Sequence, residues 1–152
     1  MRIFRVLNNG GLMFSENEAT QMLKKLGLKV THPRLNVLKI MKQSNLRHFS
    51  AEAIYEAIKN TDEDIGLATV YRILTQFSAV GLVKKLHFEE GFSLFELQSE
   101  EHHDHLVCVR CGAVEEFIDE LIEQRQHVIA EQKHFKMTDH ALVIYGVCKA
   151  CL

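Results

Sequence analysis

Two Cys-x-x-Cys pairs constrain the fold of this 152-residue chain more than any other feature of its sequence. They contain all of its cysteines, which are Cys108, Cys111, Cys148 and Cys151. Paired motifs of this kind are typical of closed, tetrahedral Zn²⁺ sites. A thioredoxin-like redox motif instead needs one pair at a helix start. We therefore predict structural zinc, for which the 36 residues between the pairs must fold back on themselves.

The segment around and between the cysteine pairs predicts a small α/β unit. "HLVCV" and "AVEEF" are typical of short strands, and residues 136–148 predict a further strand with an apolar run. Residues 119–134 predict an amphipathic helix capped by Asp119. We expect its inward face to hold Leu121, Ile122, Val128 and Ile129. So small a core favours pairing with a second copy, which predicts a dimer.

The first half of the chain predicts four helices. A Ser15–Glu18 capping box begins the first, which Gly27 ends. Thr31 is the expected N-cap of the second, with a proline in its first turn, and the third begins at Ser50. The fourth covers "LATVYRILTQFSAVG" and ends at Gly81.

The fourth helix has two different faces. Its apolar side consists of Leu67, Val70, Leu74 and Phe77. Its other side consists of Ala68, Thr69, Arg72, Thr75 and Gln76, with Tyr71 at the border. A face without carboxylates suits a DNA groove, although an ordinary surface helix is the alternative. Two strands joined at Glu89-Glu90-Gly91 follow, and this order is typical of a winged helix-turn-helix.

These patterns predict an α+β protein. We expect a disordered or loosely attached extension over residues 1–14, a winged helix-turn-helix DNA-binding domain over 15–98 and an α/β dimerisation domain over 99–152. Residues 1–88 carry 13 Lys and Arg against 7 Asp and Glu, a net charge of +6. Residues 89–152 carry 5 against 13, a net charge of −8. The basic half favours a polyanionic partner, although an uneven solvated surface would look similar.

The remaining composition bounds the location of the protein. No apolar run approaches the roughly 20 residues that cross a bilayer, and the first residues are too interrupted for a signal peptide. We therefore predict a cytoplasmic protein with no membrane partner.

The run "HHDH" directly before the first cysteine pair is rich in metal ligands. In an extended chain, side chains alternate between faces. His103 and His105 then point one way, and His102 and Asp104 point the other, so the run contributes to two sites. Distant partners are needed, and the candidates are His48, Glu96, Glu115, Glu116, Glu123 and His140. The alternative is a polar loop that caps the strand.

Several stretches together resemble the ferric uptake regulator family of bacterial metal-dependent transcription factors. They are "GLKVTHPRL", "HFSAEAIY", "DIGLATVYRILTQF", "GLVKKLHFEEGFSLFEL", "HHDHLVCVRCG", "VEEF" and "YGVCKAC". The resemblance extends over about residues 20–151.

This resemblance implies the residues of each site. The regulatory metal ligands would be His48, Glu96, His103, His105 and Glu116. The auxiliary ligands would be His102, Asp104, Glu123 and His140. Structural zinc would bind the four cysteines. Tyr71 and Arg72 would contact DNA from the recognition helix, and Lys29 would reach the minor groove. The partner would be double-stranded DNA with a palindromic, A/T-rich operator, bound by a homodimer or a tetramer.

The ligand types indicate which metal is sensed. The regulatory set has only nitrogen and carboxylate donors, which suit Fe²⁺, with Mn²⁺, Co²⁺ or Zn²⁺ as substitutes. We therefore predict an Fe²⁺-dependent repressor of iron uptake and homeostasis genes, and no enzyme. Zinc-, manganese- or peroxide-sensing members of the family are the alternatives. A metalloenzyme or a metal-storage protein belongs to another class, and a five-ligand site leaves little room for a substrate.

Overall fold

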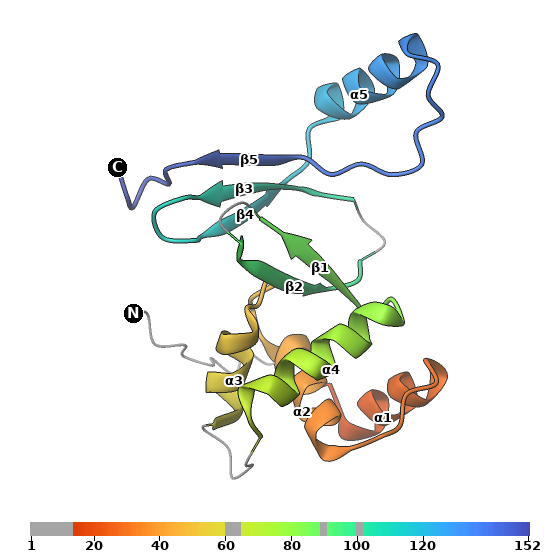
Figure 1. The fold of residues 1–152 in the computed structure, drawn as a ribbon, viewed down its shortest axis with the longest axis vertical. Helices are drawn as coiled ribbons and strands as arrows, with labels where there is room; N and C mark the ends of the chain where they lie inside the picture. The colour runs from red at the N-terminus through yellow and green to blue at the C-terminus, as the bar shows by residue number, and fades with distance from the viewer. Residues whose placement is uncertain (1–13, 60–64, 89–90, 100–101) are drawn as a thin grey trace. The chain divides into compact units, whose positions relative to one another are not determined.

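The computed structural model describes residues 14–59, 65–88, 91–99 and 102–152, which form two compact units divided after Gln98 (Figure 1). Of the predicted extension, residues 1–13 lie outside the described residues. Phe14, which we expected to be loosely attached, instead packs against the core of the first unit. Its carbonyl oxygen accepts a hydrogen bond of 3.1 Å from Gln43. The folded part of this unit therefore begins one residue earlier than expected.

The first unit begins with helices, as its caps predict. They are α1 (Glu16–Lys25), α2 (His32–Gln43), α3 (Ala51–Lys59) and α4 (Leu67–Ala79). The capping box of α1 is confirmed, since the Glu18 amide donates to Ser15 Oγ and the Ser15 amide donates to Glu18 Oε2. Thr31 occupies the N-cap of α2 but makes no side-chain capping hydrogen bond. Pro33, in the first turn of α2, instead favours the helix start through its fixed φ.

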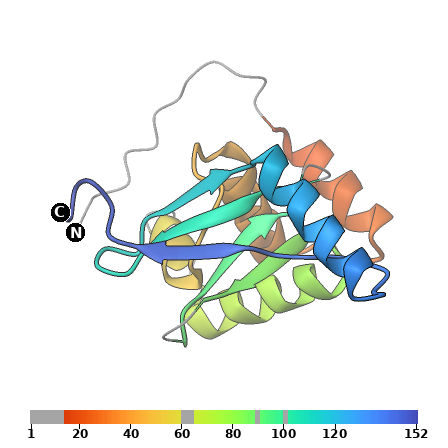
Figure 2. The ribbon, with the colours of Figure 1, turned by 90° about the horizontal axis from the view of Figure 1, so that it is seen from above.

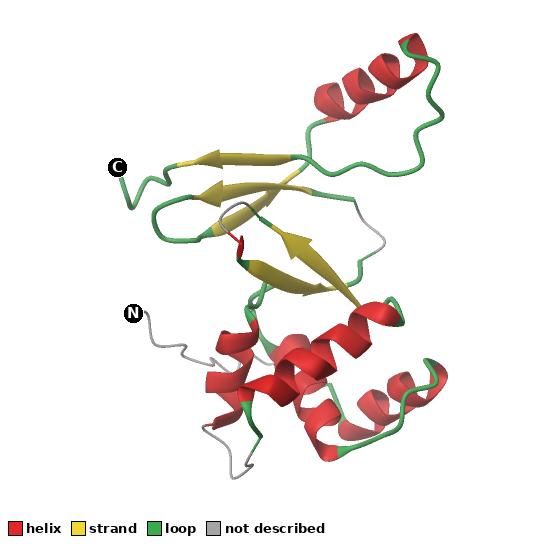
Figure 3. Cartoon of the chain, viewed as in Figure 1, coloured by secondary structure: helices red, strands yellow, loops and turns green. Residues whose placement is uncertain are grey.

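An antiparallel hairpin follows α4 and completes a winged-helix arrangement (Figure 3). Its strands are β1 (Val83–His87) and β2 (Ser93–Leu97), with Val83 opposite Leu97. Of the predicted turn, Glu89 and Glu90 lie outside the described residues. Gly91 has a φ of +80°, which a side chain would strain. The predicted pair of strands is therefore present.

The core of the first unit joins its helices to the hairpin. Phe77 of α4 and Phe95 of β2 are its largest fully buried side chains. The predicted apolar side of α4 is confirmed for Val70, Leu74 and Phe77, which are buried. Burial of each such side chain contributes roughly 1.5–3 kcal/mol. The same packing turns the opposite side of α4 to solvent, where Arg72 is exposed.

The second unit contains a three-stranded sheet in the order β4-β3-β5. Its strands are β3 (Asp104–Cys108), β4 (Val114–Phe117) and β5 (Val143–Gly146). β3 pairs antiparallel with β4 and parallel with β5. A parallel pair needs a long crossover, and the chain makes it through α5 (Glu120–Gln132) and an extended return, both visible in Figure 2.

Two expectations for this unit are wrong. The strand predicted over 136–148 is longer than the observed β5. Residues 136–142 connect α5 to β5, and strand pairing begins only where Val143 lies opposite His105. Three of the four apolar residues expected to face inward on α5 are exposed, while Ile122 is half-buried. Leu121, Val128 and Ile129 are 76%, 38% and 47% exposed. The described residues of this unit therefore leave much of their surface uncovered.

No helix in the described parts of the chain has both the length and the apolar character needed to cross a membrane.

Candidate metal centres and DNA-binding surface

The four cysteines converge in the second unit. Cys108 ends β3 and Cys111 lies in the turn that follows, and parallel pairing with β5 brings the second pair beside them. Cys111 Sγ lies 3.6 Å from Cys148 Sγ, and one sulfur from each of the four residues lies within 4.8 Å of the others. All four are free thiols. Four sulfurs this close form a donor set that fits tetrahedral zinc.

Thiol acidity differs sharply within this cluster. The Cys148 amide donates to Cys108 Sγ at 3.3 Å, and this hydrogen bond is the main cause that lowers the pKa of Cys108 to about 6. Hydrogen bonds with Cys111 and Cys148 raise the pKa of Cys151 to about 12. One thiolate therefore forms readily, while a full set of thiolates needs a cation to offset their mutual repulsion.

Arg110 is a residue of this cluster that sequence reasoning missed. Its guanidinium donates to the backbone carbonyl oxygen of Cys151 and so joins the two cysteine pairs. Its position inside the first Cys-x-x-Cys motif was the available signal.

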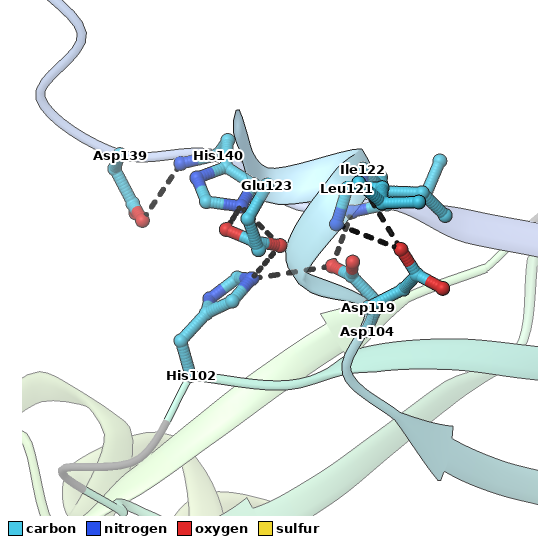
Figure 4. Close-up of polar contacts among 9 residues, drawn as sticks. His102, Asp104, Asp119, Leu121, Ile122, Glu123, Asp139 and His140 are labelled. Carbon is cyan, nitrogen blue, oxygen red and sulfur yellow. Dashed lines mark hydrogen bonds and ion pairs between the residues drawn. The ribbon is translucent and has the colours of Figure 1, made fainter. Parts of the chain in front are cut away.

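A second cluster lies at the start of β3, where His102, Asp104, Glu123 and His140 point toward one another (Figure 4). Asp119 caps α5 by accepting from the Leu121 amide, which fixes the first turn of the helix. Glu123 in that turn lies 3.4 Å from His102 and 3.0 Å from His140, between their Nε2 atoms and its carboxylate oxygens. His102 Nε2 is also 3.3 Å from Asp104 Oδ1.

The polar atoms of this cluster fit a cation. Asp104 is fully buried, and the Leu142 amide donates to its Oδ1. Its Oδ2 is buried without a hydrogen-bond partner among the described residues. His102 Nε2 is also buried and makes no hydrogen bond with suitable geometry there, although two carboxylates lie within 3.4 Å of it. Leaving such atoms unsatisfied costs about 1–3 kcal/mol each. Two imidazoles and two carboxylates are donors that a divalent ion accepts.

The opposite face of the "HHDH" run presents a different set. The His103 and His105 rings lie 5.1 Å apart, and His103 Nε2 lies 3.8 Å from Glu116 Oε1. β4 pairs Glu116 with His105 and pairs Glu115 with Leu106. Strand alternation therefore brings Glu116 to this face and turns Glu115 away to solvent. Only Asp104 and His105 of the run lie within β3, yet the alternation extends back to the two preceding histidines.

In the first unit, His48 and Glu96 form a nitrogen–carboxylate pair. An isolated antiparallel bridge joins Phe49 to Phe95, with N···O distances of 2.9 and 2.8 Å. This bridge fixes the segment before α3 to β2. His48 Nε2 consequently lies 3.0 Å from Glu96 Oε2. Nothing in the sequence spacing indicates this pair, because the bridge links positions 46 residues apart.

The outer side of α4 carries the expected DNA contacts. Tyr71 and Arg72 are exposed, and so is Lys29 in the connection between α1 and α2. The Tyr71 hydroxyl donates to Glu52 Oε1 at 2.6 Å. This hydrogen bond lowers the pKa of Glu52 and raises that of Tyr71. Glu52 lies on α3, and no sequence spacing connects it to Tyr71.

A winged-helix unit joined to a small α/β unit that holds clustered metal donors defines a class of metal-dependent DNA-binding regulators. The model of the ferric uptake regulator family matches residues 25–145. The ferric uptake regulation protein of Legionella pneumophila is 63% identical over 134 residues, which cover 88% of this chain and 98% of that protein.

Two solved structures are also similar to the chain. The Vibrio cholerae ferric uptake regulator has a TM-score of 0.80 and 51% identity, covering 85% of this chain and 98% of that chain. The Helicobacter pylori ferric uptake regulator, described as having three functional metal-binding sites, has a TM-score of 0.79 and 30% identity, covering 95% and 97%. The chain belongs to the ferric uptake regulator family. The family consists of transcriptional regulators that act as dimers, rather than of enzymes.

Proposed function

We propose that the protein is an Fe²⁺-dependent repressor of genes for iron uptake and homeostasis. The separation of donor types carries this proposal. Sulfur donors gather in one cluster, and the other clusters contain only imidazole and carboxylate. Thiolates suit a permanent zinc ion, while nitrogen and oxygen donors suit an exchangeable Fe²⁺ or Mn²⁺ ion. The high identity to a ferric uptake regulation protein supports iron as the sensed metal.

Structural zinc is proposed at the four cysteines, with Cys108 from the end of β3, Cys111 from the turn that follows and the other pair from the segment after β5. Bound there, zinc would supply a rigid cross-link between β3 and β5. The chain itself contributes the Arg110 clamp on the Cys151 carbonyl and the Cys148 amide that donates to Cys108. Both contacts bring the pairs together and so reduce the entropy lost when metal binds.

The regulatory site is proposed to combine side chains from both units. Its ligands are His48, Glu96, His103, His105 and Glu116. Ligation of one ion by all five fixes the angle between the DNA-binding and dimerisation domains. In a symmetric dimer, that angle sets the spacing of two recognition helices on a palindrome. Coupling of roughly 1–3 kcal/mol between metal and DNA would raise operator affinity about 5- to 150-fold.

The auxiliary site is proposed at His102, Asp104, Glu123 and His140. Its buried, unsatisfied Asp104 and His102 atoms support a bound cation. Such an ion would join the beginning of β3 to the first turn of α5. This site therefore acts within the dimerisation domain, and its expected effect is on the stability of that domain.

Operator recognition is proposed to use α4 in the major groove. Arg72 can donate to guanine or to phosphate, and the Tyr71 ring can pack on a thymine methyl group. Lys29 suits the narrow minor groove of A·T-rich DNA. The operator is accordingly expected to be a palindromic, A·T-rich duplex bound by one dimer or by two dimers as a tetramer. Because the proposed operator is chromosomal DNA, we propose that the protein acts in the cytoplasm.

A metal titration of operator binding tests this function. The zinc-loaded protein should bind its operator tightly with Fe²⁺ or Mn²⁺ and weakly after chelation of the regulatory ion. Fluorescence anisotropy with labelled duplex measures the affinity under anaerobic conditions. Operator binding in cells that follows zinc and ignores iron depletion would contradict iron sensing. Turnover of a substrate that is lost in His103→Ala, without any DNA binding, would favour an enzyme.

A further inference from the structure

Arg34 connects two elements that the proposed function places on DNA. It lies in the first turn of α2 and is half-buried. Its Nη1 donates to the backbone carbonyl oxygen of Lys29 at 2.5 Å. Its Nη2 donates to the side-chain oxygen of Gln76 on α4 at 2.7 Å. One guanidinium therefore joins the Lys29 segment to the recognition helix.

The contacts of Gln76 indicate that it acts inside the protein. The sequence placed this residue on the polar side of α4, together with Arg72 and Thr75. In the structure, Gln76 is only half-exposed, and its carbonyl oxygen accepts from Arg34. That oxygen is therefore engaged, while Arg72 remains exposed at the DNA-facing side of the same helix.

We propose that Arg34 is a positioning residue for DNA binding, which holds Lys29 at a fixed distance from the recognition helix. This inference rests on the proposed function. The connection from Leu26 to Thr31 includes Gly27 at a φ of +71° and has no regular secondary structure over Leu28–Thr31. Leu28 and Val30, which flank Lys29, pack against the core, and the Leu28 amide donates to the Leu23 carbonyl oxygen. Arg34 adds a hydrogen bond to the carbonyl oxygen of Lys29 itself.

A fixed distance matters because the two proposed contacts lie in different grooves. The separation of adjacent major and minor grooves is set by the DNA, so Lys29 and α4 must match it together. A restrained Lys29 binds at a higher effective concentration once α4 is seated. Arginine suits this role better than lysine, because its planar guanidinium holds two acceptors in defined directions. The two hydrogen bonds of Arg34 order the Lys29 segment before DNA binds, so less conformational entropy is lost on binding.

A double-mutant cycle in the full-length, zinc-loaded protein tests this role. The probe is a palindromic A·T-rich duplex that the wild type selects from a randomised pool in the presence of Mn²⁺. Lys29→Ala and Arg34→Ala should each weaken binding about tenfold. The double variant should be no more than about twofold weaker than either, because both changes remove the same contact. Arg34→Lys keeps the charge and should remain impaired, because one ammonium group cannot replace the two-armed clamp.

Two further variants separate positioning from folding and from charge. Gln76→Ala removes one arm of the clamp without removing a positive charge, and it should weaken binding only when Lys29 is present. Lys39→Ala removes a cation from the same helix, where it pairs with Glu16 at 2.7 Å, and should leave operator affinity unchanged. Thermal unfolding is recorded for every variant. If Arg34→Ala does not fold, the operator affinity of Gln76→Ala, with and without Lys29, tests the proposal instead.

The outcomes distinguish this inference from the proposed function. Losses from Lys29→Ala and Arg34→Ala that add fully would overturn it and would indicate that Arg34 contacts DNA directly. A folded Arg34→Ala variant with wild-type affinity would also overturn it. If the wild type selects no duplex in the presence of metal, the proposed function fails, and the positioning role fails with it.

Discussion

The Tyr71 hydroxyl donates to Glu52 within the protein, which leaves its ring as the part of the side chain that can contact DNA. The exposed ring lies on the same helix as Arg72. The proposed contact of Tyr71 with the operator is therefore expected to be apolar, such as packing on a thymine methyl group, rather than a hydrogen bond from the phenol. The Glu52 carboxylate serves as an internal acceptor and keeps the ring in place.

Removing the hydroxyl group of Tyr71 should change the pKa of Glu52. The hydrogen bond from Tyr71 is the main cause of the lowered Glu52 pKa, so Tyr71→Phe should raise that pKa toward 4.5. A depressed folded-state pKa contributes stability above pH 4.5, and this contribution is lost as pH falls through the lowered pKa. Tyr71→Phe should therefore reduce the loss of stability on acidification. Carboxyl ¹³C NMR titration measures the pKa, with Tyr55→Phe on α3 as the control.

Arg72 is expected to make a base or phosphate contact from the exposed side of α4. Arg72→Ala should lower operator affinity by about 1–3 kcal/mol, as expected for loss of a charged contact. Fluorescence anisotropy with metal-loaded protein checks this, and Lys39→Ala is the control for the loss of one cation. An unchanged operator footprint would argue against α4 as the reading helix.

At the scale of elements, the helices of the first unit follow directly from their sequence signals. The capping box at Ser15 and the apolar spacing of α4 depend on residues a few positions apart, so both can be predicted from the local sequence. The predicted strand over 136–148 was wrong because its length depends on pairing with β3, which is set by a partner far away in sequence. Local backbone geometry also matters at the end of α5, where His134 adopts a φ of 59°.

Replacing His134 should stabilise the protein. It follows the C-cap of α5 in the left-handed region, where the Phe135 amide donates to the Ala130 carbonyl oxygen. Side chains are strained in this conformation and glycine is not. His134→Gly should raise the free energy of unfolding by about 0.5–1 kcal/mol. Chemical denaturation at constant protein and zinc concentrations measures it. His134→Ala keeps the strain and should give no gain.

At the scale of the whole molecule, we expect the exposed apolar side of α5 to be covered by the second copy in a dimer. Ile129 is 47% exposed in one copy, and the family's regulators act as dimers. Ile129→Asp would bury a charge in the contact and should weaken dimerisation at least about tenfold. Sedimentation equilibrium measures the dimer constant. The exposed polar residue Gln124 provides the control Gln124→Asp. Equal effects of the two variants on the dimer constant would show that the apolar side of α5 does not lie in the dimer interface.

Zinc is expected to contribute stability to the second unit, whose sheet has few buried residues. Cys148→Ser should reduce zinc content and lower the unfolding midpoint by about 10 °C, because binding free energy at a structural zinc site is folding free energy. Elemental analysis and calorimetry check the two effects. His127→Ala, an exposed change on α5, should retain zinc. Full zinc content in Cys148→Ser would contradict the four-cysteine site.

The sequence by itself determined the properties that depend on neighbouring residues. These include the helices and their caps, the cysteine pairs, and the alternation that separates His103 and His105 from His102 and Asp104. The tertiary structure alone decided which distant residues meet. It placed Glu123 and His140 beside His102, turned Glu115 away while Glu116 faces His103, and joined Arg34 to Gln76. Local signals follow from backbone geometry, whereas these contacts depend on strand register and helix packing, which only the folded chain establishes.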